Sequence, residues 1–153
     1  MGAEARLAEL GITLPELVPP LAAYQPTARS GNLVFTAGQL PARDGEMLAV
    51  GKVGREVTED EGYQCARQCA LNALAAVKAE IGSLDDITRV VKVVVFVAST
   101  PDFTGQPKVA NGASELLGEV FGDAGKHARS AVGVAALPLD VPVEVEIVVE
   151  VRS

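Results

Sequence analysis

Aromatic side chains are nearly absent from this sequence. Of its 153 residues, 4% are aromatic and none is tryptophan. The interior must therefore be built from valine, alanine and leucine, because large rings are not there to fill it. The scarcity also excludes a platform of aromatic rings on which the bases of a single-stranded nucleic acid could stack.

Positive charge is also scarce, and it is not clustered. The 13 lysine and arginine residues are outnumbered by 20 acidic residues, and the net charge is -7. The basic residues stand singly along the chain between Arg6 and Arg152. Because proteins that bind the phosphate backbone need clustered cations, we expect no nucleic-acid partner.

Long hydrophobic runs are missing as well. The longest unbroken apolar run, Val93 to Ala98, is much shorter than the ~20 residues that a membrane-spanning helix needs. Residues 1–12 hold no apolar stretch of the kind that forms the core of a signal peptide. We therefore expect a soluble protein of the cytoplasm that makes no contact with a membrane.

The sequence contains only two cysteines, and their spacing argues against a disulfide and against a metal site. Cys65 and Cys69 lie four positions apart on a predicted helix, so both face the same side. A disulfide between adjacent helical turns would distort the backbone, and a metal site would need further ligands that are not in view. The pattern indicates two reduced cysteines packed in the core, and we expect neither a metal nor another cofactor.

The sequence does contain a clear succession of strand and helix patterns. Ser30-Gly31-Asn32 is a hairpin signal, and Thr58 forms a capping box with Glu61 ahead of a long helical pattern. This order predicts one mixed sheet with two helices on one face, and self-association to cover the other face. The predicted elements are strands at 21–29 and 32–37, a loop with one short strand at 42–57, a helix from 58 to 82, a buried strand at 89–98, a helix at 107–121 and two strands within 127–151.

One cation stands out in the last of these segments. Arg129 is flanked by small and apolar residues over 128–132, which is a poor setting for a solubilising charge. A guanidinium is a rigid fork of donors that fits a carboxylate or a phosphate, so the sequence favours a bound ligand for it. The alternative is an ion pair with Glu144 or Glu146, which lie on the acidic face of the alternating strand that follows.

Four short motifs occur in order along the chain. They are Thr36–Pro41 with Tyr24 ahead of it, Asn111 before Ser114-Glu115, Ala128–Ser130, and Leu137-Pro138 followed by Val143–Glu146. Together they resemble the RidA/YjgF family, and more narrowly its longer YjgF-like branch, which carries the label endoribonuclease. The resemblance implies an α/β (α+β) domain with a chorismate-mutase-like fold. It runs from about Ala22 to Arg152, so we expect a family domain at 21–153 and an N-terminal extension, a short helix and a proline-rich linker, at 1–20.

The resemblance also implies a homotrimer with a ligand cleft at each boundary between subunits. The best-known members of the family hydrolyse reactive enamines and imines, such as 2-aminoacrylate, to 2-oxo acids and ammonia. Arg129 would then hold the substrate carboxylate, and Glu144 would hold or deprotonate the attacking water. Backbone groups near Gly38 would orient the planar substrate, and Tyr24 and Asn111 would line the cleft.

Two positions depart from the family pattern. Ala37 stands where the family's turn has serine, and Ala131 stands where many deaminating members have cysteine. Both changes remove polar contacts from the expected cleft and leave the arginine in place. Three functions therefore stay open: an enamine or imine deaminase, a non-catalytic trimer that binds small carboxylates as a sensor or scavenger, and, least favoured, an endoribonuclease. His127, the sole histidine, is interpreted as a loop residue at the start of a strand rather than a general base.

Overall fold

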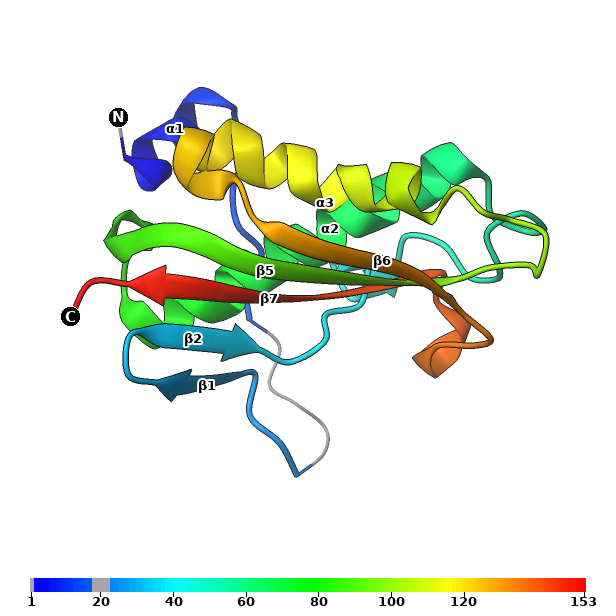
Figure 1. Cartoon of the computed structure of the whole chain (residues 1–153), viewed down its shortest axis with the longest axis horizontal. Coiled ribbons are helices and arrows are strands. Elements are labelled where there is room, and N and C mark those ends of the chain that lie inside the picture. Colours follow the sequence, from blue (N-terminus) through cyan, green and yellow to red (C-terminus); the bar gives the residue numbers. More distant parts are fainter. Residues whose placement is uncertain (1, 18–22) are drawn as a thin grey trace.

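A five-stranded sheet lies at the centre of the fold, with the strand order β1-β2-β7-β5-β6 (Figure 1). The computed structural model describes residues 2–17 and 23–153. Neighbouring strands run antiparallel, except that β5 and β6 run parallel, so the predicted mixed sheet is confirmed. The strands are β1 (Thr27–Ser30), β2 (Leu33–Thr36), β5 (Ile87–Ala98), β6 (Ala128–Val134) and β7 (Val143–Val151).

The region before the long helix differs from its sequence prediction in two places. The first strand begins at Thr27, and the start of the strand predicted at 21–29, like Pro19 and Pro20 of the linker, lies outside the described residues. Residues 42–57 hold two short strands where one was predicted, β3 (Ala42–Arg43) and β4 (Glu46–Met47), which pair with each other. Asp44 and Gly45 join them with φ angles of 53° and 81°, and positive φ at both central residues is typical of a tight two-residue hairpin.

Two long helices pack on one face of the sheet, and a third, short helix joins them. The helix α2 (Glu59–Ile81) packs on β7, and α3 (Gln106–Phe121) packs on β5 and β6. The short helix α1 (Ala3–Glu9) lies against α3 and the 3-10 turn η1 (Leu84–Asp86), and it buries Ala3 and Leu7 (Figure 1). The described residues thus form three α-helices, the two predicted on the sheet and the short one predicted in the N-terminal extension.

A capping box begins helix α2, and a glycine lies where α2 and α3 cross. The predicted capping box of α2 is present: Thr58 Oγ1 accepts from the amide of Glu61, and a Glu61 carboxylate oxygen accepts from the amide of Thr58, both at 3.1 Å. Where α2 meets α3, a Cβ on Gly112 would lie 2.0 Å from the carbonyl oxygen of Tyr63. Only a glycine at this position allows the two helices to approach so closely.

Alternation along β7 separates the core from the other face of the sheet. The residues at 143, 145, 147, 149 and 151 are buried toward the helices, and those between them are half-buried on the opposite face. Cys65 and Cys69 are both free thiols in the core, as the sequence predicted.

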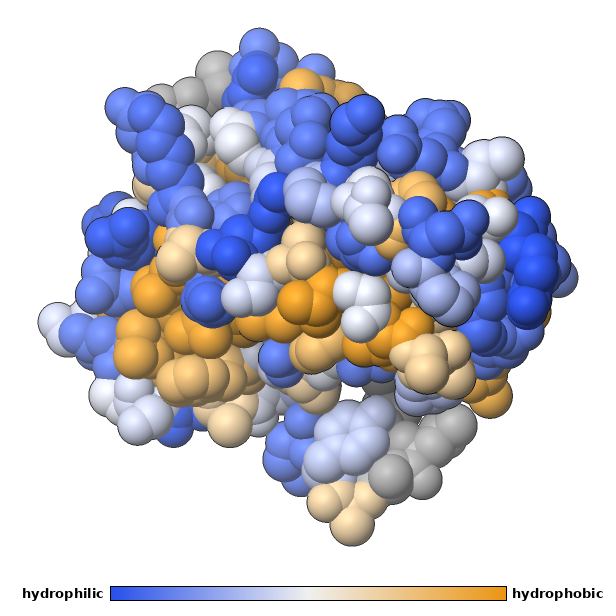
Figure 2. Space-filling model, turned by 45° about the vertical axis from the view of Figure 1, so that its right-hand side comes forward, coloured by the Kyte–Doolittle hydropathy of each residue, from blue (hydrophilic) through white to orange (hydrophobic). Residues whose placement is uncertain are grey.

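The face of the sheet away from the helices, here called the open face, is rich in apolar side chains. No helix of the described residues packs on it. Figure 2 shows apolar side chains gathered across this side of the molecule. Phe35 of β2 and Val132 of β6 are 41% and 44% exposed, which is unusual for side chains so large and apolar on a strand. Across residues 2–17 and 23–153, no helix is long and apolar enough to cross a membrane.

Candidate functional site

Arg129 lies on β6, the edge strand of the sheet, and its side chain meets helix α3. In the parallel register, Arg129 is the partner of Val93, which is fully buried on the helix side. The guanidinium Nη1 donates to Asn111 Oδ1 at 2.8 Å and to Ser114 Oγ at 3.1 Å. The structure therefore brings together the arginine and the asparagine that the sequence placed in one site.

These two bonds leave one edge of the guanidinium available to a ligand. Nη1 has two hydrogens, and both have acceptors on α3. Among the described residues, no hydrogen-bond partner is found for Nε or Nη2 of Arg129. Because Nε and Nη2 donate in parallel, this edge can hold both oxygens of one carboxylate.

The alternative interpretation of Arg129, an ion pair with a glutamate of β7, is wrong. No ion pair among the described residues includes Arg129. Glu144 and Glu146 lie on the open face, while Arg129 lies on the helix face. The strand β5 also lies between β6 and β7, so Arg129 and the two glutamates belong to different environments.

Ser114 and His127 belong to the arginine site, although the sequence did not predict it. Ser114 Oγ lies 2.8 Å from His127 Nε2, and His127 Nδ1 lies 2.6 Å from the carbonyl oxygen of Gly125. His127 is a half-buried loop residue directly before β6, as interpreted from the sequence. The spacing of Asn111 and Ser114, which puts both on one face of a helix, is the sequence signal that could have pointed to Ser114.

Glu144 lies against the turn that carries Gly38. A Cβ on Gly38 would be 2.0 Å from Glu144 Oε2, so the carboxyl group occupies the space that any other residue's side chain would need. Gln39 holds the turn on β7, because its amide donates to the Val145 carbonyl at 2.8 Å and its carbonyl accepts from the Val145 amide at 3.0 Å. Partial burial raises the pKa of Glu144, and the charge of Glu146 on the same face raises it further.

The other three predicted site residues lie in three different parts of the chain. Ala131 lies two positions after Arg129, in register with buried Val95 on the helix face. Ala37 precedes Gly38, and its amide donates to the carbonyl of Pro26 at 2.8 Å. Tyr24 is 51% exposed and is free to contact a ligand or a second molecule. The predicted residues thus form two separate groups, here called the half-sites of the candidate site: Arg129 with Asn111 on the helix side, and Glu144 with Gly38 on the open side.

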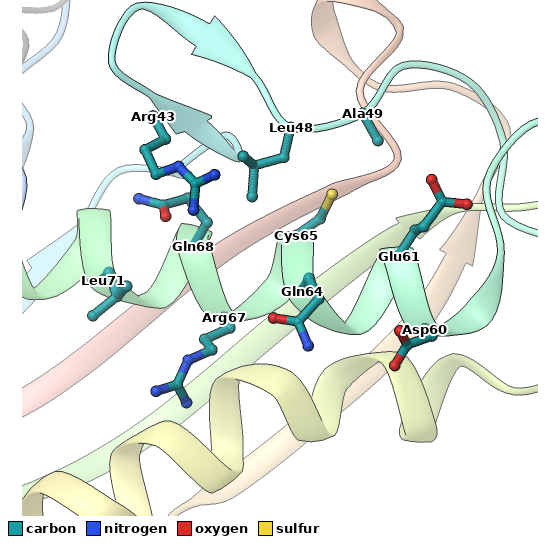
Figure 3. Close-up of a pocket in the computed structure, with 10 residues that line it drawn as sticks. All are labelled: Arg43, Leu48, Ala49, Asp60, Glu61, Gln64, Cys65, Arg67, Gln68 and Leu71. Atoms are coloured by element: carbon teal, nitrogen blue, oxygen red, sulfur yellow. The ribbon is translucent and has the colours of Figure 1, made fainter. Parts of the chain in front are cut away.

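The cavities of the isolated chain lie elsewhere. A pocket of about 390 Å³ opens between the β3–β4 hairpin and α2 (Figure 3). Figure 3 shows Arg43 and Leu48 reaching from the hairpin side toward Gln68 and Cys65 of α2, whereas Arg67 points away toward α3. Burial raises the pKa of the Cys65 thiol to about 11, so it is protonated at neutral pH and is no nucleophile. A second hollow, of about 460 Å³, lies between α1, η1 and α3.

None of the residues predicted for the site lines either cavity. Over the described ranges, there is also no group of three or more histidine, cysteine or acidic residues that could hold a metal ion. The candidate site is therefore formed by half-buried side chains outside these two cavities, with Arg129 on the edge strand and Glu144 on the open face.

The sheet order, the helix pair and the edge arginine define a small α/β domain of the chorismate-mutase-like class. The chain belongs to the YjgF/RidA family: the family model described as "YjgF/chorismate_mutase-like, putative endoribonuclease" matches residues 4–151. Protein TCP17 of Trypanosoma cruzi is 45% identical over 150 residues, which are 97% of this chain and 94% of that protein. The crystal structure of Atu1372 from Agrobacterium tumefaciens is 46% identical, with a TM-score of 0.91 over 98% of this chain and 92% of that one.

Two further relatives carry names that describe chemistry. The 2-iminobutanoate/2-iminopropanoate deaminase of Dermatophagoides farinae is 31% identical over 143 residues, covering 92% of this chain and 95% of the deaminase. The crystal structure of Escherichia coli TdcF with bound serine is 26% identical, with a TM-score of 0.64 over 90% of this chain and 94% of that one.

Proposed function

We propose that this chain binds a small carboxylate through Arg129 and hydrolyses reactive enamines or imines to 2-oxo acids and ammonia. The observation that carries the proposal is the guanidinium itself. Two of its hydrogens are held by α3, no acidic residue among those described neutralises it, and its Nε–Nη2 edge is free for a carboxylate. The deaminase from Dermatophagoides farinae and the serine bound to TdcF support a small amino-acid-derived ligand.

The proposed cleft lies between copies of the chain in a homotrimer. Within one copy, the sheet separates Arg129 from Glu144 and Gly38, so one small substrate cannot touch both half-sites. A second copy that packs on the open face would bring its own Arg129 to the Glu144 of the first. The apolar side chains exposed on that face, Phe35 and Val132 among them, support such an interface.

The proposed reaction needs little beyond positioning and one base. Arg129 holds the substrate carboxylate, and Glu144 accepts a proton from water as the water oxygen attacks the carbon of the protonated imine. Glu144 then returns this proton to the nitrogen of the carbinolamine, the C–N bond breaks to release ammonia, and Glu144 takes up the hydroxyl proton as the carbon becomes the carbonyl of a 2-oxo acid. A Glu144 carboxyl whose pKa is raised suits this exchange, because a base works best when its pKa is close to the working pH. The reaction uses no cofactor and no metal.

A non-catalytic trimer that binds small carboxylates is the second candidate, and two residues favour it. Ala37 and Ala131 stand beside the half-sites and offer no side-chain polar group to the ligand. The anchor at Arg129 does not depend on either of them. In this case the protein would bind 2-oxo acids without turning over an imine.

Two measurements on wild type and Arg129→Ala separate these candidates. We expect wild type to release ammonia from freshly generated 2-aminoacrylate, and Arg129→Ala to lose that activity. Thermal unfolding with 2-oxobutyrate should show a higher Tm for wild type and no shift for the variant, because a ligand stabilises only the state that binds it. Binding without ammonia release would identify the non-catalytic module. If no carboxylate in a panel of 2-oxo and amino acids shifts the Tm, both candidates are excluded.

A further inference from the structure

A chain of hydrogen bonds connects Arg129 Nη1, on the side opposite its free edge, to Ser114, His127 and the carbonyl of Gly125. Every group in this chain donates to the next one. The carbonyl of Gly125 can only accept, so His127 Nδ1 carries the hydrogen of their 2.6 Å bond. In a neutral imidazole, Nε2 then accepts, and the hydroxyl of Ser114 donates to it over 2.8 Å. The same hydroxyl oxygen accepts from Arg129 Nη1 at 3.1 Å. Donation therefore runs from Arg129 through Ser114 and His127 to the backbone.

We propose that Ser114 and His127 are positioning residues of the carboxylate site, and that binding of a carboxylate to Arg129 is coupled to uptake of a proton by His127. The inference rests on the proposed function of Arg129 and adds to it how the guanidinium is held and how the site responds to pH. Arg129 has both hydrogens of Nη1 fixed by α3, one by Asn111 and one by Ser114. The orientation of its free edge is set by these two contacts, and Ser114 is itself oriented by His127.

A second proton on His127 reverses one bond in the chain. Protonated Nε2 donates to Ser114 Oγ, so this oxygen accepts from both His127 and Arg129 and stands between two positive charges. A carboxylate on the free edge of Arg129 offsets that repulsion. The ligand therefore favours protonated His127, and by reciprocity protonated His127 favours the ligand. Carboxylate binding therefore tightens as the pH falls, because protonated His127 is the form that the ligand favours.

Arg129 is the charged group that the hydrogen-bond chain joins to His127. The other charged groups on the nearest parts of α3, η2 (Gly122–Gly125) and β5 are paired elsewhere or face away. Asp123 pairs with Lys126, Glu115 accepts from Tyr63, Glu119 pairs with Arg67, and Lys92 lies in the register of the open face. Glu144 lies on the open face as well, so its own titration needs a separate control.

The test is calorimetric titration of the full chain with 2-oxobutyrate at pH 5.5 and pH 8. For wild type we expect binding about threefold tighter at the lower pH, the order of magnitude that Coulomb's law gives for two unit charges that are not in contact in a medium of high dielectric constant. His127→Gln keeps an acceptor for Ser114 but does not titrate, so its affinity should be the same at both pH values. Glu144→Gln removes the other group that could titrate, and it should keep the threefold dependence.

The positioning role is tested with Ser114 at a single pH. Ser114→Ala should weaken binding about tenfold, because it removes an acceptor of a charged donor, and Ser114→Thr should restore the affinity. Tyr63→Phe is the matched control: it removes the hydrogen bond to Glu115, which follows Ser114 on α3, and touches neither His127 nor Arg129. It should leave binding and its pH dependence unchanged.

The outcomes distinguish this inference from the proposed function. If wild type binds and Arg129→Ala does not, the carboxylate site stands. The positioning role is then overturned by Ser114→Ala binding as well as wild type. A pH dependence that survives in His127→Gln, or that disappears in Glu144→Gln, assigns it to Glu144 and overturns the coupling to His127. If wild type binds no carboxylate, the proposed function itself fails.

Discussion

At the scale of single residues, the site depends on how two charged side chains are held. The guanidinium of Arg129 divides its donors between helix α3 and the solvent, so the protein fixes its orientation without neutralising it. The carboxyl group of Glu144 is fixed differently, because it fills the space beside a glycine. The surroundings of Glu144 predict how single substitutions beside it will change catalysis and its pH dependence.

Gly38→Ala should remove catalysis and leave carboxylate binding almost intact. The new Cβ would meet Glu144 Oε2 at 2.0 Å, so the carboxyl group must move away from the turn. We expect ammonia release from 2-aminoacrylate to fall at least about tenfold, because a displaced base no longer reaches the attacking water. Affinity for 2-oxobutyrate, measured by titration, should change little. If the mechanism is right, adding Gly38→Ala to a Glu144→Ala variant has no further effect on the rate.

Glu146→Gln should move the pH dependence of the reaction. Burial is the larger cause of the raised pKa of Glu144, and the charge of Glu146 is the second. Removing that charge lowers the pKa of Glu144, so its ionised form persists to lower pH. The rate falls with pH as Glu144 is protonated, and we expect this fall at lower pH in the variant. The control is Glu150→Gln on the same face of β7; a profile of Glu146→Gln equal to that of wild type would contradict the influence of Glu146 on the base.

At the scale of helices and strands, the sequence predicted most elements and missed how some of them meet. The alternation over 143–151 and the Thr58–Glu61 capping box are local patterns, and both are confirmed. The β3–β4 hairpin was missed because its turn is only Asp44-Gly45 within a loop rich in glycine and charge. Of the two hydrogen-bond partners of Arg129, the sequence predicted one as a site residue and missed the other. Asn111 was found through the family motif, but Ser114 needed the parallel register of β6 on β5, which turns the arginine toward α3.

Gly112→Ala should destabilise the domain through the crossing of α2 and α3. Its Cβ would lie 2.0 Å from the carbonyl oxygen of Tyr63, and backbone atoms cannot move aside as a flexible side chain can. We expect a loss of about 1–3 kcal/mol in the free energy of unfolding, measured by urea denaturation. The control is Gly118→Ala on the same helix, where no atom lies within 4 Å of the new Cβ. That substitution should be neutral or slightly stabilising, because alanine favours a helix over glycine.

At the scale of the whole molecule, the two half-sites and the open face raise the question of whether copies of the chain assemble. The helices bury one face of the sheet, and the other exposes apolar side chains (Figure 2). Glu144 lies on this second face. A homotrimer would cover those side chains and join the half-sites of different copies. Val132→Glu should therefore lower the mass measured by sedimentation and remove carboxylate binding with it. Ala79→Glu, an exposed substitution on α2, which packs on the other face of the sheet, should leave assembly unchanged.

Mixing two inactive variants tests directly whether each site is shared. Arg129→Ala lacks the anchor and Glu144→Ala lacks the base, so neither alone should release ammonia. When the two are unfolded together and refolded as mixed trimers, a cleft is complete where Arg129 of one subunit meets Glu144 of another. Random assembly at equal amounts gives about one quarter of the wild-type activity, because each cleft needs one particular variant on each side. If both residues acted from one chain, no cleft in any mixture would be complete, and the mixture would stay inactive. Mixing Arg129→Ala with Arg129→Lys is the control for refolding, since it offers no wild-type arginine to any cleft.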